Sequence, residues 1–146
     1  MRILVVLTGG TIGSKIDENI INVNSAAACR LITLYQENYG IDTEFEVLQP
    51  MNILSENLIP AYWKILFDCL DQVNFDEYDG IIITHGSDTL AYTAAMTGFC
   101  FAHTTIPIVL IASNYALEEK RSNGLANFCN AVSFIRERKV KGVFVI

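Results

Sequence analysis

The sequence lacks any apolar run near the roughly 20 residues that a membrane-spanning helix needs. Glycines interrupt its first apolar run, MRILVVLTGG, too early for a signal peptide. Basic residues are also few, since 10 Lys and Arg stand against 16 Asp and Glu, for a formal net charge of −6. Nucleic-acid-binding proteins carry clustered basic residues. We therefore expect a cytoplasmic protein with neither a membrane nor a nucleic-acid partner.

Cysteine is scarce and widely spaced. The four cysteines stand about 30 to 40 residues apart, so no pair has the spacing of a zinc or redox motif. Each lies within an apolar helical pattern, which predicts buried, reduced thiols at Cys29, Cys69, Cys100 and Cys129. We expect neither a metal ion nor a cofactor.

Proline and glycine are too rare for a disordered or fibrous chain. Only 3 prolines and 9 glycines accompany 51% hydrophobic residues, and the mean hydropathy is +0.34. A chain of 146 residues with this composition has the size of one domain with a substantial core. We expect residues 1–146 to form a single domain.

Apolar β-branched runs alternate with helical patterns along the sequence. The expected strands are 3–7, 43–48, 81–84, 107–111 and 142–146. The expected helices are 25–37 and three that begin near residues 60, 88 and 124, and residues 14–24 are expected to be irregular. This alternation predicts an α/β fold: an open, doubly wound parallel sheet sandwiched by helices, a Rossmann-like or flavodoxin-like three-layer arrangement.

Unusual polar segments follow the ends of the expected strands. They are TGGT, QPMNILSEN, THGSDT and ASNYALEEKRSNG. In open parallel sheets, ligands bind at the carboxyl ends of the strands. The sequence therefore predicts a ligand site at this edge.

Two of these segments leave alternatives open. The glycines of 8–13 suit either a tight connection or a ligand loop, but the order GxGxxG of a dinucleotide loop is absent. At 85–89, the backbone N–H groups at the start of the expected helix favour an anionic group, which suits a ligand site. Asp88 can instead be the N-cap of that helix. His85 is a candidate base or a hydrogen-bonded spacer at the end of a buried strand.

Taken together, these motifs resemble the L-asparaginase/glutaminase family, in its N-terminal domain. The signature TGGTIG matches 8–13, and HGTDT[LM] matches 85–90 with Ser87 in place of threonine. Residues 117–124 resemble the family's LxELRSDG loop, with Asn123 in place of aspartate. The match is nearest to the cytoplasmic type I branch and to the related subunit of the archaeal tRNA-dependent amidotransferase.

The resemblance implies hydrolysis of a side-chain amide, such as that of L-asparagine, to a carboxylate and ammonia. Thr11 then matches the nucleophile, and Ser87 the second catalytic hydroxyl. Asp88 matches the catalytic and binding carboxylate that pairs with the substrate α-ammonium group. Ser55 and Glu56 are expected to line the α-carboxylate subsite. The backbone N–H groups near Gly86 and Ser87 are natural oxyanion donors.

Several positions depart from the family pattern. Ile20 stands where the family has a mobile tyrosine, and an aliphatic side chain cannot assist a hydroxyl nucleophile. Lys139 and Lys141 precede the last expected strand, whereas the family's catalytic lysine follows it. The smaller C-terminal domain of the family is also missing, so the sequence reads as a truncated chain or a natural remnant. A domain that binds a small amino acid or a partner protein without turnover is therefore the alternative. In either case a homo-oligomer is expected.

Overall fold

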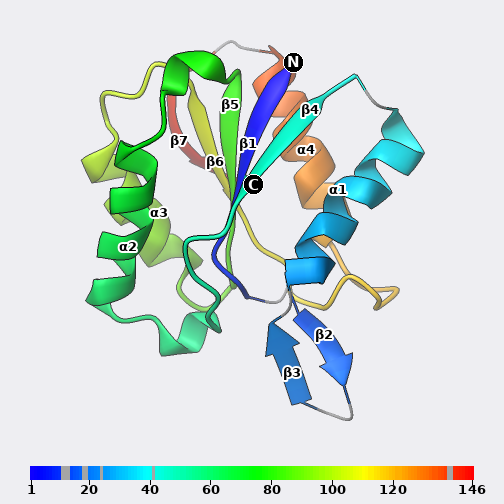
Figure 1. Cartoon of the computed structure of the whole chain (residues 1–146). Coiled ribbons are helices and arrows are strands. Elements are labelled where there is room, and N and C mark those ends of the chain that lie inside the picture. The colour runs from blue at the N-terminus through cyan, green and yellow to red at the C-terminus, as the bar shows by residue number, and fades with distance from the viewer. Residues whose placement is uncertain (11–13, 18–19, 24, 41, 138–139) are drawn as a thin grey trace.

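The computed structural model describes residues 1–10, 14–17, 20–23, 25–40, 42–137 and 140–146, and its main element is a parallel sheet (Figure 1). Five described strands stand in the order β4-β1-β5-β6-β7, and every neighbouring pair is parallel. Their bounds are β1 Arg2–Leu7, β4 Glu44–Leu48, β5 Gly80–Thr84, β6 Pro107–Ile111 and β7 Gly142–Val145. The predicted doubly wound α/β fold is confirmed, in the flavodoxin-like order.

Helices cover both faces of the sheet, so the domain has three layers. Those within the described residues are α1 Ser25–Tyr39, α2 Pro60–Asp71, α3 Leu90–Cys100 and α4 Gly124–Glu137. In Figure 1, α1 and α4 lie on one side of the sheet, and α2 and α3 lie on the other. Each side has its own core, because alternate residues of the buried strands face opposite layers.

The central strands explain why the sheet is buried on both faces. All residues of β5 and β6 are buried. Strand β6 is apolar throughout, and β5 is apolar until it ends at Thr84. Toward α1 and α4 the core holds Phe128 among residues of β1, β5 and β6. Toward α2 and α3 it holds Leu66 and Leu70. These two helical residues are four apart, as one face of a helix requires.

The expectation that residues 14–24 are irregular is wrong. Strand β2 (Ser14–Asp17) pairs with β3 (Ile20–Val23) in an antiparallel two-stranded sheet. The β-branched residues on either side of the polar sequence Asp-Glu-Asn are a hairpin signal, and the irregular prediction gave them too little weight. In Figure 1 this hairpin projects beyond the carboxyl ends of β1 and β5.

Helix α3 has an unusual distribution of side chains. Its fully buried positions are Thr93 and Thr97, whereas Tyr92, Met96 and Phe99 are 64%, 36% and 82% exposed. The expectation of buried cysteines is wrong for Cys100, which is exposed at the end of this helix. The Cys69 and Cys129 thiols are only partly buried, and the Cys29 side chain lies outside the described residues.

No helix in the described part of the chain is both long enough and apolar enough to cross a lipid bilayer.

Candidate active site

The order of the strands places two of the predicted motifs side by side. The chain leaves β1 toward β4 and later returns to the other side of β1 to form β5, so the winding reverses between β1 and β5. Such a switch point is where doubly wound sheets bind ligands. Gly9 and Gly10 follow β1, and the turn 85–88 follows β5. Both motifs lie at the carboxyl edge of the sheet, where the sequence placed them, and the strand order adds that they flank the switch point.

Three segments meet here through glycines. Gly9 and Gly10 have φ values of 104° and 75°, a conformation that side chains other than glycine rarely adopt. A Cβ on Gly10 would lie 2.6 Å from the Cα of Gly86. A Cβ on Gly86 would lie 2.5 Å from the Cβ of Ser55. The glycines thus allow backbone contact between the TGG segment, the 85–88 turn and the segment around Ser55.

Ser55 and Asp88 form the polar centre of this junction. The Ser55 hydroxyl donates to Asp88 Oδ2 at 2.8 Å, and the Asp88 N–H donates back to Ser55 Oγ at 3.3 Å. The Thr89 hydroxyl donates to the Ser55 carbonyl at 2.9 Å. Ser55 is buried, whereas Asp88 is exposed. The Asp88 carboxylate therefore faces solvent, and the buried Ser55 hydroxyl fixes its orientation.

Asp88 does not cap helix α3. The N-cap residue is Thr89, and no side chain makes a capping hydrogen bond there. The structure thus excludes the N-cap role that the sequence left open for Asp88. Its carboxylate lies instead at the junction with Ser55.

His85 is buried and fully hydrogen-bonded. Its Nδ1 lies 2.8 Å from the Gly86 carbonyl oxygen, and its Nε2 lies 2.9 Å from Thr93 Oγ1. Burial lowers the pKa of His85 below its ordinary value, because the charged imidazolium would lose its hydration. With both ring nitrogens engaged, His85 occupies the spacer role rather than that of an available base.

Residues of the loop after β6 form hydrogen bonds with one another. Asn123 Oδ1 accepts from Ser113 Oγ and from the Asn114 N–H, each at 3.0 Å. Ser122 Oγ donates to the Tyr115 carbonyl at 3.1 Å. An amide oxygen therefore serves as acceptor at the position where the resemblance has an aspartate.

The remaining predicted residues are distributed unevenly. Ser87 and Glu56 are exposed, Ser87 in the 85–88 turn and Glu56 in a short 3₁₀ helix, η2 (Ser55–Asn57). Lys141 is exposed beside the start of β7, and β7 begins opposite Pro107 at the amino ends of the strands. It therefore lies at the opposite edge of the sheet, as expected. Thr11 and Lys139 lie outside the described residues, and of Ile20 only the place in β3 is described.

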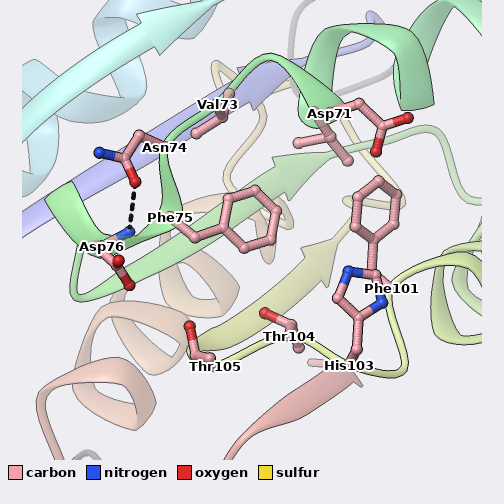
Figure 2. A pocket seen from close by; sticks show the side chains of 10 residues that line it. Asp71, Val73, Asn74, Phe75, Asp76, Phe101, His103, Thr104 and Thr105 are labelled. Atoms are coloured by element: carbon pink, nitrogen blue, oxygen red, sulfur yellow. Dashed lines mark hydrogen bonds between the residues drawn. The ribbon is translucent and has the colours of Figure 1, made fainter.

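A hollow of about 290 Å³ lies at that opposite edge, away from the predicted site. Figure 2 shows the aromatic rings of Phe75, Phe101 and His103 along it, with Asp71 and Asp76 at its margins. It is formed by the chain after α2 and the chain before β6. None of the predicted site residues in the described part of the chain lines it.

Two residues at the junction were missed by the sequence analysis. Thr93 binds His85 from α3, and Trp63 of α2 donates its indole N–H to Thr93 Oγ1 at 3.0 Å. The available signal was the repetition of threonine at 89, 93 and 97, the N-cap and two positions of an otherwise apolar helix. Polar residues four apart share one helical face.

Comparison with known proteins agrees with this geometry. Residues 2–146 match the family model described as "Asparaginase, N-terminal". The chain belongs to the asparaginase family. It is 34% identical to a glutamyl-tRNA(Gln) amidotransferase subunit of Methanococcus maripaludis over 99% of its own length and 34% of that protein.

Solved structures give the same result. The thermostable L-asparaginase from Thermococcus kodakarensis superimposes with a TM-score of 0.81 at 32% identity, and L-asparaginase I from Vibrio cholerae with 0.85 at 30%. Each comparison covers 99% of this chain and 43% of the other. The chain thus spans about a third to two fifths of the length of these asparaginase-family relatives.

Proposed function

We propose that this chain forms the amide-binding domain of an asparaginase-type amidohydrolase, which converts L-asparagine to L-aspartate and ammonia. The observation that carries the proposal is the solvent-facing Asp88 carboxylate, held by the buried Ser55 hydroxyl at the switch point of the sheet. A fixed, accessible carboxylate is suited to the α-ammonium group of an amino acid. Membership of the asparaginase family supports the same chemistry.

The proposed roles of the other residues follow the order of the reaction. Thr11 attacks the amide carbon, forming an acyl-enzyme and releasing ammonia, and water then releases the carboxylate. Ser87, exposed in the same turn as Asp88, supplies the second hydroxyl. Gly10 packs against the amide nitrogen of Gly86, which leaves the Ser87 N–H as the better placed oxyanion donor.

Ser55 acts on the substrate through Asp88 in this proposal. Its hydroxyl proton is engaged with the Asp88 carboxylate, so direct contact with an α-carboxylate requires that hydroxyl to turn. Glu56, beside it and exposed, is proposed to lie at the entrance of the same subsite. Both assignments locate the amino-acid backbone of the substrate next to η2 and its side-chain amide next to the 85–88 turn.

A second function is favoured by three positions. Ile20, Ser87 and Asn123 depart from the pattern at places where the resemblance puts reactive or binding groups. Under this alternative the domain binds a small amino acid, or a partner protein, without turnover. Ile20→Tyr separates the two, because a restored phenol raises ammonia release only if the remaining machinery is catalytic.

Association with a second copy and a cytoplasmic location are part of the proposal. The exposed apolar side chains of α3 support self-association, because monomeric proteins rarely expose contiguous apolar patches. The helix carries no charged residue, so two chains of net charge −6 can approach each other along it.

The test is an ammonia-release assay with L-asparagine and L-glutamine on the wild-type chain and on Thr11→Ala. Release that Thr11→Ala abolishes supports the nucleophile assignment. Full release that survives this substitution overturns it. Release from L-glutamine alone changes the substrate but leaves the reaction class in place.

A further inference from the structure

A chain of hydrogen bonds leads from helix α2 to the turn that carries Asp88. The Trp63 indole N–H donates to Thr93 Oγ1 at 3.0 Å, Thr93 Oγ1 lies 2.9 Å from His85 Nε2, and His85 Nδ1 lies 2.8 Å from the Gly86 carbonyl oxygen. Thr93 and His85 are 0% and 1% exposed. We call Trp63, Thr93 and His85 the positioning chain.

The direction of every bond in the positioning chain follows from donor and acceptor chemistry. An indole N–H only donates and a carbonyl oxygen only accepts. The Gly86 carbonyl therefore requires the proton of His85 on Nδ1. In the neutral ring Nε2 is then an acceptor, and it receives the Thr93 hydroxyl proton while Thr93 Oγ1 accepts from Trp63. Each donor hydrogen and each acceptor atom takes part in one of these bonds, and a single tautomer of His85 satisfies all three.

This arrangement fixes the orientation of the peptide group between Gly86 and Ser87. In a trans peptide the carbonyl oxygen and the following N–H point in opposite directions, and no peptide in the described chain is cis. Because His85 holds the Gly86 oxygen on the buried side, the Ser87 N–H points away from His85, and Ser87 itself is exposed. Contacts of Gly86 with Gly10 and Ser55 prevent this peptide from shifting as a unit.

We propose that Trp63, Thr93 and His85 position the Ser87 N–H to receive the developing oxyanion of the substrate, a role that rests on the proposed amidohydrolase function. They are positioning residues, because Thr93 and His85 are buried and the three residues act through the Gly86 carbonyl that His85 binds. The negative charge of the oxyanion is then met by a donor whose direction is set before the substrate arrives. His85 contributes through the bond that it donates to Gly86, without gaining or losing a proton.

Two threonines on α3 provide a matched pair for the test. Thr93→Val removes the donor to His85 Nε2, whereas Thr97→Val removes an equally buried hydroxyl that donates to the Thr93 carbonyl at 2.7 Å. Both variants lose one buried hydroxyl from the same helical face. Thr93 Oγ1 accepts from Trp63 of α2 whereas the Thr97 hydroxyl bonds within α3, so Thr97→Val controls for the loss of a buried hydroxyl. The Ser87 amide signal separates positioning from packing of α2 against α3, because a role confined to packing leaves that signal unmoved. Thr93→Ser keeps the hydroxyl and serves as the rescue.

The first measurement is independent of any ligand. In nitrogen-15 spectra of the whole chain carrying His103→Asn, both remaining imidazole nitrogen signals belong to His85, since the sequence has 2 histidines. We expect the neutral Nδ1–H tautomer of His85 at pH 7. In Thr93→Val we expect a shifted Nε2 signal, because that nitrogen loses its donor, and a shifted Ser87 amide signal. In Thr97→Val and Thr93→Ser we expect neither change. An Nε2–H tautomer in the wild type, or an unmoved Ser87 signal in Thr93→Val, overturns the positioning chain.

The second measurement compares two ligands by calorimetry. L-Aspartate carries a side-chain carboxylate that can accept from the Ser87 N–H, whereas L-alanine has the same α-groups without it. Thr93→Val should weaken binding of L-aspartate by roughly tenfold, as loss of a charge-assisted hydrogen bond does, and leave binding of L-alanine unchanged. Equal weakening of both ligands overturns the oxyanion role. Failure of the wild type to bind either ligand overturns the proposed function, while the tautomer measurement still decides the positioning chain.

Discussion

The Ser55 hydroxyl donates to the Asp88 carboxylate at 2.8 Å and joins two segments that are 33 residues apart in the sequence. Ser55 is buried and Asp88 is exposed, so a buried hydroxyl sets the direction of an accessible charge. The bond also connects the chain after β4 with the chain after β5, the two sides of the switch point.

Removal of this hydroxyl should both weaken amino-acid binding and destabilise the fold. In Ser55→Ala the Asp88 carboxylate stays in water but loses its fixed direction, so we expect roughly tenfold weaker binding of L-aspartate. The free energy of unfolding should fall by about 1–2 kcal/mol, since one buried hydrogen bond is lost. Calorimetry and urea unfolding measure the two effects. Unchanged affinity in a folded Ser55→Ala chain would show that the bond does not orient the site.

The glycine contacts predict opposite outcomes for two alanine substitutions. Gly86→Ala places a Cβ against Ser55 and should lower the free energy of unfolding by several kcal/mol, or prevent folding. Gly98→Ala, within α3, meets no atom within 4 Å and should raise stability by about 0.5–1 kcal/mol, because alanine favours the helix. Urea unfolding of both variants checks the pair. A well-tolerated Gly86→Ala would contradict the close packing at the junction.

The buried imidazole predicts a pH dependence of stability. Burial lowers the pKa of His85 in the folded state, so the unfolded chain binds more protons between that value and the ordinary pKa of about 6.5. The contribution of His85 to the free energy of unfolding is therefore fully present above about pH 6.5. It is lost as the pH falls through the folded-state pKa.

Unfolding in urea at pH 7.5 and at lower pH measures this loss. The control is His103→Asn, which alters the exposed histidine and should leave the loss in place. A loss of the same size in His85→Gln would assign the effect to other groups.

The apolar face of α3 predicts self-association. We expect a dimer or larger species by sedimentation at tens of micromolar, and Phe99→Lys should shift it toward monomer. The control is Tyr39→Lys, a 60% exposed aromatic position at the end of α1, in the other helical layer. A wild-type monomer under these conditions, or equal effects of the two substitutions, would contradict an interface on α3.

The sequence predicted the sheet well because its central strands are continuous apolar runs. Such runs admit one interpretation in an alternating α/β pattern, and strand 107–111 was predicted residue for residue. Helix 25–37 was placed within two residues of its end, since Gly40 supplies a left-handed stop with φ 91°. Local signals of this kind need no tertiary information.

What the sequence could not supply are relations between distant segments. Thr93 looks like an ordinary helical position, and its hydrogen bonds with His85 and Trp63 are seen only in the structure. The same holds for Ser55, whose partner stands 33 residues away. The predicted grouping of Ser55, Gly86 and Asp88 is present, whereas Thr11 lies outside the described residues and its part in the site stays a prediction.

The central claim is that Asp88 binds the α-ammonium group of an amino acid, and calorimetry with L-aspartate tests it most directly. The wild-type chain should bind L-aspartate weakly, and Asp88→Asn should weaken that binding by at least about tenfold, since the opposite charge is removed. Asp76→Asn removes an exposed carboxylate at the opposite edge of the sheet and should leave binding unchanged. Undiminished binding of L-aspartate by a folded Asp88→Asn chain would contradict the account.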